Sequence, residues 1–256
     1  MSLNVLFVGE TNIVYLTEHK GLDSFTQTRY TEYASVFGKT LTDAGHRFTH
    51  IPCHLVQADF PQTLEALQAY DVVILSDVGA NTMLQRPDSF APSTNYLRLI
   101  RDFVADGGGF IMIGGYLSFA GIEGKARYHR TLVEDILPVE IQPYDDRVEA
   151  PEGISVEMGP APHPVIAGLP HDIPHVFGYN RVTSKAGAEI IAHTSLGDPL
   201  IVLGAYGRGR SVAYTTDCVQ DWASPELLAW QHYPTLWARL LHWVSARQTS
   251  VGASAS

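Results

Sequence analysis

The stretch GGGFIMIGGYLSFAG, residues 107–121, sets the first expectations for the fold. It contains an apolar run, Phe110–Ile113, with glycines on both sides, which is typical of a strand buried on both faces of a sheet. A helix is predicted to follow from Tyr116. In many α/β enzymes a strand–turn–helix unit of this kind holds a catalytic nucleophile on a sharp bend. Here the bend offers Gly114, Gly115 and Tyr116, so either the nucleophile is missing or the site is of another kind.

The rest of the chain divides into two patterns. In the first half, strands are predicted at Leu3–Gly9, His46–Pro52 and Asp71–Asp77, and helices at Phe25–Ala44, Thr63–Ala69 and Ser93–Ala105. This alternation predicts a parallel sheet of order 2-1-3-4-5 with helices on both faces. In the second half, Val148–Met158, Ala188–Thr194, Pro199–Gly207 and Gly209–Asp217 are predicted to be extended. Short turns between the last three strands predict an antiparallel extension of the sheet, with helices from Ser224 onward.

Composition narrows the function classes. The chain has 256 residues, 45% of them hydrophobic, and we expect a single domain over residues 1–246 with a disordered tail at residues 247–256. The net charge of −10 disfavours binding to nucleic acid or to anionic membranes. Two cysteines and the absence of a basic, apolar leader at the N-terminus favour a cytoplasmic location. No GxGxxG or GxxxxGK[ST] motif occurs, so neither a nicotinamide nor a nucleoside triphosphate cofactor is expected.

Polar residues follow each predicted parallel strand. Because the carboxyl ends of parallel strands meet at one edge of a sheet, ligands bind there. We therefore predict that one pocket is bordered by Glu10, Asp77, Tyr116, His129, Asp217 and Trp222. Turn formation and helix capping are the alternative roles for any single one of these polar residues.

The chain contains, in this order, the stretches LNVLFVGE, YDVVILSDVG, ADGGGFIMIGG, HPVIAGLP and YGRGRSVAYTTD. Together they resemble the class I glutamine amidotransferase-like superfamily. The similarity is greatest to its GATase1-like branch and to the ThuA-like proteins. This resemblance implies a flavodoxin-like three-layer α/β/α sandwich, with a mainly parallel sheet.

The resemblance does not extend to the catalytic residues of that superfamily. Its active members place a cysteine in G-x-C-x-G at the bend, with a His and a Glu near the last strand. If Gly114 matches the first glycine, Tyr116 takes the cysteine position and Ser118 the second glycine; a shifted register puts Gly115 at the cysteine position. His232, in QHYP, has no glutamate two residues later. Thioester chemistry needs the thiolate and its base, so we do not expect glutaminase activity.

Other residues remain as candidates for catalysis or binding. Ser118 could replace the missing nucleophile, although a helix-capping role is the simpler interpretation. Arg127 and His129, in KARYHR, could reach an anionic or sugar-like ligand, or could belong to a solvated basic loop. Trp222 directly follows a strand and could stack on a ligand, whereas Trp230 and Trp237 have the spacing of a packed helix face.

The evidence for a metal in the sequence is weak. His46, His50, Cys53 and His54 are close in sequence, but no HExxH or CxxC motif occurs. His163, His171 and His175 are predicted to lie in a proline-rich loop. A magnesium site built from Glu10, Asp77 and Asp217 is a separate possibility, but no metal is expected.

Two hypotheses for function follow. The first is a divergent member of the superfamily that binds a small polar metabolite, for which a sugar derivative is one candidate, at the edge of the sheet. Its catalytic candidates are Ser118, His129 and Asp217, and its ligand-binding candidates are Glu10, Asp77, Gly114, Gly115, Tyr116, Arg127, His129 and Trp222. The alternative is a non-catalytic regulatory or interaction subunit. Homo-oligomer formation is left open.

Overall fold

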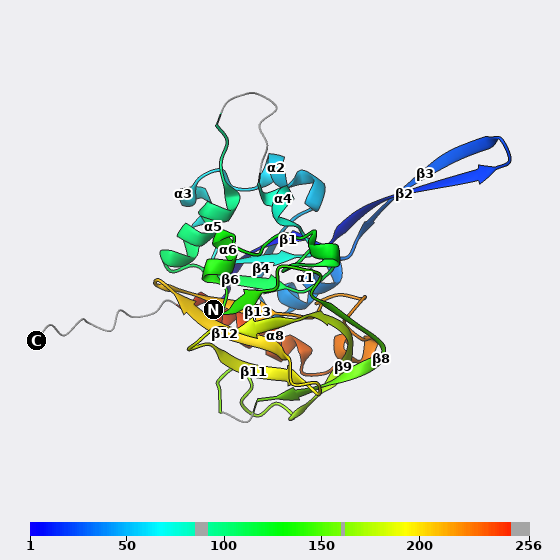
Figure 1. The fold of residues 1–256 in the computed structure, drawn as a ribbon. Coiled ribbons are helices and arrows are strands. Elements are labelled where there is room, and N and C mark those ends of the chain that lie inside the picture. The colour runs from blue at the N-terminus through cyan, green and yellow to red at the C-terminus, as the bar shows by residue number, and fades with distance from the viewer. Residues whose placement is uncertain (85–91, 160–161, 247–256) are drawn as a thin grey trace, which may run out of the picture.

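One nine-stranded sheet organises the chain in the computed structural model, which describes residues 1–84, 92–159 and 162–246 (Figure 1). The strand order is β4 (Arg47–Ile51), β1 (Asn4–Gly9), β5 (Val72–Ser76), β6 (Gly109–Ile113), β13 (Gly209–Tyr214), β12 (Pro199–Tyr206), β11 (Glu189–Thr194), β8 (Arg147–Met158) and β9 (Asp172–Asn180). The first five strands in this spatial order, which are β4, β1, β5, β6 and β13, are mutually parallel. The predicted order 2-1-3-4-5 is therefore confirmed.

The second half of the sheet is antiparallel. β13 pairs with β12, β12 with β11, β11 with β8, and β8 with β9, each in antiparallel register. The predicted extension is confirmed and is larger than expected, because β8 and β9 also belong to it. His175 therefore lies in a strand, not in the proline-rich loop predicted from the sequence.

Helices cover both faces of the sheet. α1 (Ala34–Asp43) and α8 (Tyr233–Ser245) lie on one face, and α3 (Leu64–Leu67), α5 (Tyr96–Ala105) and α6 (Leu132–Ile136) lie on the other. Alternate residues of β1 supply the two cores: Phe7 packs toward α1 and α8, while Leu6 packs toward α5. This is a flavodoxin-like three-layer α/β/α arrangement. Trp237 is buried in α8, as its spacing predicted.

Shorter elements complete the described chain. They are η1 (Cys53–Leu55), α2 (Val56–Asp59), α4 (Ala80–Met83), η2 (Ile122–Gly124), α7 (Pro225–Leu228) and a small sheet of β7 (Val139–Ile141) with β10 (Val182–Ser184). The Ser224 side chain caps α7 by accepting a hydrogen bond from the Leu227 N–H. Among the described residues, no helix is both long and apolar enough to span a membrane. The predicted tail, residues 247–256, lies outside the described residues.

Two predicted helices are corrected. The segment predicted as the start of helix Phe25–Ala44 belongs instead to a hairpin of β2 (Thr11–Lys20) and β3 (Asp23–Glu32), and only Ala34–Asp43 is helical. Cross-strand pairing with β2 stabilises β3 as a strand, and this pairing prevails over the helical spacing of apolar residues from which the helix was predicted.

No helix begins at Tyr116. The chain turns irregularly there, and both Phe119 and Gly121 have positive φ values that an α-helix cannot accommodate. The Asp146 carboxylate accepts hydrogen bonds from the N–H groups of Ala120 (2.9 Å) and Gly121 (2.8 Å), which an α-helix would direct elsewhere.

Candidate functional site

The carboxyl ends of the parallel strands open into one pocket of about 580 Å³. Its lining residues are Glu10, Asn12, Tyr33, Asp77, Phe177, Asp217, Val219, Gln220, Asp221, Ala223 and Pro225. Glu10 follows β1, Asp77 follows β5, and Asp217 follows β13 closely. The structure thus brings together the three carboxylates that the sequence predicted to converge.

Glu10 is held in place by the close approach of two strands. It has a positive φ of 53°, and its backbone N–H donates to the Ser76 carbonyl at 3.2 Å. The preceding Gly9 allows this approach, because a Cβ there would collide with the same carbonyl oxygen. The Glu10 side chain is buried and accepts a 2.6 Å hydrogen bond from the Ser76 hydroxyl. Burial raises the pKa of Glu10 well above its usual range, and the nearby charges of Asp217 and Asp77 raise it further.

Asp77 also lies at a strained turn, with a φ of 46°. Its carboxylate accepts a 2.6 Å hydrogen bond from the Leu117 N–H, which connects the end of β5 to the bend after β6. Burial raises the pKa of Asp77, although this backbone hydrogen bond opposes the rise. The ends of two neighbouring strands, β1 and β5, therefore each hold a carboxyl group on a left-handed backbone. This conformation costs free energy and is common at functional sites.

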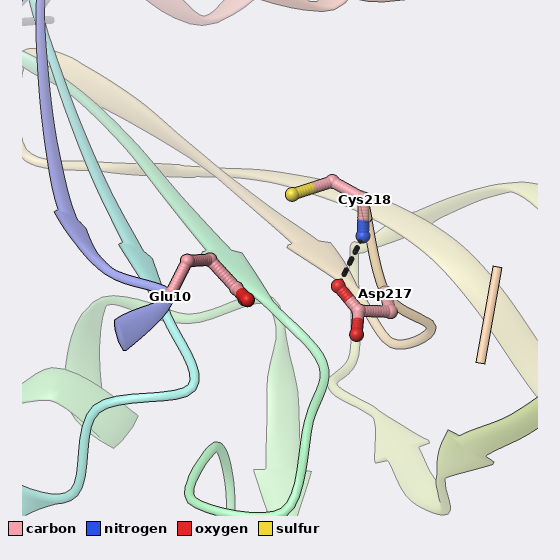
Figure 2. Close-up of side chains that lie close together, drawn as sticks. All are labelled: Glu10, Asp217 and Cys218. Atoms are coloured by element: carbon pink, nitrogen blue, oxygen red, sulfur yellow. Dashed lines mark hydrogen bonds between the residues drawn. The ribbon is translucent and has the colours of Figure 1, made fainter. Parts of the chain in front are cut away.

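Asp217 and Cys218 face Glu10 from the end of β13 (Figure 2). The Asp217 carboxylate accepts hydrogen bonds from the N–H groups of Cys218 (2.6 Å) and Val219 (3.1 Å). Burial nevertheless raises the pKa of Asp217 well above its usual range, and it does the same to the pKa of the Cys218 thiol.

Glu10, Asp217 and Cys218 could together hold a cation. One potential ligand atom from each residue lies within 4.8 Å of the other two. The third donor in this group is thus a thiol, and Asp77, which the sequence analysis grouped with Glu10 and Asp217, is not part of it. The expectation that no metal is bound stays a prediction.

The bend after β6 packs too tightly for larger residues. A Cβ at Gly114 would collide with the Thr215 carbonyl oxygen, and one at Gly115 would approach the Asp77 carboxylate to 2.9 Å. The Asn180 side chain accepts a 3.0 Å hydrogen bond from the Gly115 N–H. These glycines permit the close contact between strand ends, while their role as ligand-binding residues stays a prediction.

Ser118 lies beneath this bend. It is buried, and its hydroxyl accepts a 3.1 Å hydrogen bond from the Asp77 N–H. The hydroxyl thus stabilises the strained turn at Asp77. Its proposed role as a nucleophile remains untested.

Tyr116 and Trp222 do not line the pocket, although they lie near it. Their rings contact each other with centroids 5.7 Å apart, and the Arg147 guanidinium lies 4.7 Å above the Tyr116 ring. Trp222 is only 2% exposed, and it packs so closely on Gly178 that a Cβ there would collide with the indole. Trp222 and Asp221 border a second hollow, of about 510 Å³, that also includes Glu149.

The structure corrects the placement of His129 and Arg127. Neither lines the carboxylate pocket; both border a separate cavity of about 990 Å³ that also includes Thr131 and Pro143. The His129 ring is within hydrogen-bonding distance of the Ile141 carbonyl, at 2.8 Å. Several residues between the bend and His129 have positive φ, and they direct the chain away from the pocket. His129 therefore lies outside the pocket although it follows the bend closely in the sequence.

The sequence analysis did not select several of the lining residues. Tyr33 and Asn12 come from the base of the β2–β3 hairpin, and Phe177 comes from β9. Asp221 lies beyond the end of β13 and was not among the residues selected from the sequence. Partial burial raises the pKa of Asp221, and Glu149 adds to the effect. The short separation of Asp221 from Asp217 in the sequence was the one signal that could have identified Asp221 as a pocket residue.

Comparisons with known proteins identify the class of protein that this fold and site represent. Residues 4–246 match the GATase1-like family, described as "Putative glutamine amidotransferase". The chain belongs to this family. No curated protein matches the chain.

Two solved structures from Salmonella typhimurium are similar over nearly the whole chain. Cytoplasmic Protein STM3548 is 38% identical, with 95% of this chain and 99% of that one covered and a TM-score of 0.90. Cytoplasmic Protein STM1381, from strain LT2, is 39% identical, with coverages of 94% and 99% and a TM-score of 0.90. A "Putative thua-like protein" from Parabacteroides merdae shares the fold at 12% identity, with coverages of 99% and 94% and a TM-score of 0.56.

Proposed function

We propose that this family member binds a small polar metabolite in the carboxylate pocket and that the ligand is rich in hydrogen-bond donors. One observation carries the proposal: Glu10, Asp77, Asp217 and Asp221 line one pocket whose described lining contains no lysine, arginine or histidine. An amine or a cluster of hydroxyl groups complements such a lining, and an anionic ligand does not.

The carboxyl groups supply different parts of such a site. Asp217 and Glu10 are buried, and their raised pKa values favour protonated forms that can donate as well as accept hydrogen bonds. Asp221 is exposed at the rim and can pair with a positive charge. Tyr33 and Phe177 add aromatic surface, which suits the apolar face of a sugar ring or an ammonium group. An amino sugar combines these features.

The proposal excludes glutaminase activity. Gly114, Gly115 and Tyr116 stand at the bend, so any thiol would have to come from elsewhere. The thiol beside the pocket, Cys218, has a pKa raised by burial and by Glu10, which opposes formation of the nucleophilic thiolate. We expect no glutamate release from glutamine by the wild type, by Cys53→Ala or by Cys218→Ala. Turnover that Cys218→Ala abolishes would contradict this part of the proposal.

The regulatory-subunit alternative is less favoured. A filled cleft together with a large exposed apolar patch would have supported it. The strand ends instead form a pocket with clustered carboxyl groups of raised pKa. A cytoplasmic location and the lack of nucleic-acid or membrane partners remain part of our proposal. The acidic charge and the two Salmonella relatives described as cytoplasmic proteins support it.

A thermal-shift screen tests the binding proposal. Amines, amino sugars, neutral sugars and dicarboxylates are compared, because a ligand at 100 times its Kd adds about 2.7 kcal/mol to stability. We expect stabilisation by an amine or polyhydroxyl compound and none by the dicarboxylates. Asp221→Asn should weaken that effect, while Asp172→Asn, on an exposed part of β9, should not. Stabilisation by dicarboxylates alone, or equal binding by both variants, would contradict the proposal.

A further inference from the structure

The β2–β3 hairpin forms an arm that projects away from the sheet and its helices (Figure 1). Its strands pair with each other over ten residues each, and no third strand joins them within the described chain. A lone two-stranded hairpin is marginally stable in water and leaves two edges open for pairing. The arm therefore has more exposed backbone and apolar surface than an isolated monomer requires.

The two faces of the arm differ in charge. Cross-strand pairing places Ile13, Tyr15, Thr17 and His19 of β2 on one face with Ser24, Thr26, Thr28 and Tyr30 of β3. This set, the uncharged face, contains no Asp, Glu, Lys or Arg. At the base of the arm, the next pair on the same side, Thr11 with Glu32, adds one carboxylate. Tyr15 is 69% exposed and Tyr30 50% exposed. The opposite face carries charged groups, and there the Lys20 ammonium lies 5.3 Å from the Phe25 ring centroid.

The uncharged face has a gradient of side-chain size. The two rows near the base pair Ile13 with Tyr30 and Tyr15 with Thr28, and the next two pair Thr17 with Thr26 and His19 with Ser24. Near the middle, the Thr17 and Thr26 hydroxyls are hydrogen-bonded at 3.0 Å. If two arms stack face to face in opposite directions, the Ile13–Tyr30 pair of one arm lies over the His19–Ser24 pair of the other. The Tyr15–Thr28 pair then lies over the Thr17–Thr26 pair. Bulky rows then meet smaller ones.

We propose that the uncharged face binds the same face of a second copy of this chain, giving a two-fold symmetric dimer. This inference is independent of the proposed pocket function. A two-fold interface uses the same patch on both partners, and the size gradient makes this patch complementary to itself when reversed.

Charge also favours a second copy as the partner. The chain carries a net charge of −10, so two copies repel each other over most of their surfaces. The arm is close to neutral, since residues 11–32 contain two basic and three acidic side chains. On the side of the uncharged face, the one charged group is Glu32, which lies at the base of the arm. Two such chains can approach at the uncharged face without bringing like charges together.

The size of the contact predicts a modest affinity. Ten residues per strand make the arm about 33 Å long, and two strands make it about 10 Å wide. Stacked arms thus bury an area at the small end of specific interfaces, below about 1,200 Å² in total. Dissociation on dilution is expected.

Sedimentation of the full chain over a range of concentrations tests the proposal. The wild type should approach twice the chain mass of 28.1 kDa. Tyr15→Lys places a charge on the uncharged face and should weaken dimerisation at least tenfold. Leu16→Lys, on the neighbouring residue of the opposite face, is the matched control and should change dimerisation less than twofold. Both side chains are exposed, so unchanged circular dichroism and Tm of the dilute protein are expected for each variant.

Three results would overturn the inference. The first is a wild type that stays monomeric at about 100 times the concentration of the dilute sample, whether or not it binds another protein. The second is a Tyr15→Lys variant that dimerises like the wild type. The third is an equal loss of dimer in Tyr15→Lys and Leu16→Lys. Retention of the dimer in Leu16→Lys together with its loss in Tyr15→Lys would support it.

Discussion

Replacing Glu10 by glutamine should change how the stability of this protein depends on pH. Burial and the neighbouring charges raise the pKa of Glu10 well above the value of 4.5 that it has in an unfolded chain. Between these two pKa values, the folded protein holds a proton that the unfolded chain has released. The contribution of Glu10 to stability is therefore complete below pH 4.5 and is lost as the pH rises toward the pKa of the folded state.

The size of this effect follows from the difference of one proton. Within that window, the free energy of unfolding falls by about 1.4 kcal/mol per pH unit at 25 °C. A domain of about 250 residues changes its Tm by about 2–4 °C per kcal/mol. Glu10 alone should thus lower the Tm by about 3–6 °C for each pH unit.

Denaturant unfolding at several pH values measures the effect. Glu10→Gln removes the titration but keeps an oxygen that can accept the hydrogen bond from Ser76. The variant should gain stability relative to the wild type as the pH rises above 4.5 toward the raised pKa of Glu10 in the folded protein. Glu152→Gln, exposed on β8, is the control and should follow the wild type. Parallel stability curves for Glu10→Gln and the wild type would refute the reasoning.

Three further predictions concern the geometry around the pocket. Gly9→Ala should destabilise the fold by about 3 kcal/mol or more, because its Cβ would collide with the Ser76 carbonyl. Gly45 also has a positive φ but has open space around it, so Gly45→Ala should cost only about 1–2 kcal/mol. Denaturant unfolding of both variants measures the difference. Asp146→Ala should cost about 3 kcal/mol in the same assay, because it leaves two backbone N–H groups and one side-chain amide without their acceptor; a loss below about 1 kcal/mol would contradict this. His129→Ala should leave the affinity for any pocket ligand unchanged in calorimetric titration, and a tenfold loss would show that the two cavities communicate.

Much of the sheet could be predicted because its strands have local signals. Asp71–Asp77 and Phe110–Ile113 are continuous apolar runs between polar or glycine residues, and the structure places strands within one residue of both ranges. The convergence of Glu10, Asp77 and Asp217 then followed from a general property of parallel sheets. These predictions needed no knowledge of the loops.

The remaining features depend on contacts that a sequence does not display. The β2–β3 arm has exposed apolar groups and threonines, so it lacks the burial pattern from which strands are recognised. The position of His129 depends on a path through Phe119, Glu123 and Arg127, non-glycine residues with positive φ that local propensity does not anticipate. Tyr33 and Phe177 reach the pocket from distant segments of the chain, and only the folded topology brings them together.

Glu10 is the single residue between β1 and β2, so the pocket and the arm share one stretch of backbone. Its carbonyl also accepts a 3.0 Å hydrogen bond from the N–H of Tyr33, which ties the other strand of the arm to the same point. Thermodynamic linkage makes the consequence reciprocal. If the pairing of arms changes the affinity of the pocket for a ligand by some factor, the bound ligand changes the dimerisation affinity by the same factor. A change in metabolite concentration would then be converted into a change in the proportion of paired chains, a signal that requires no chemical reaction.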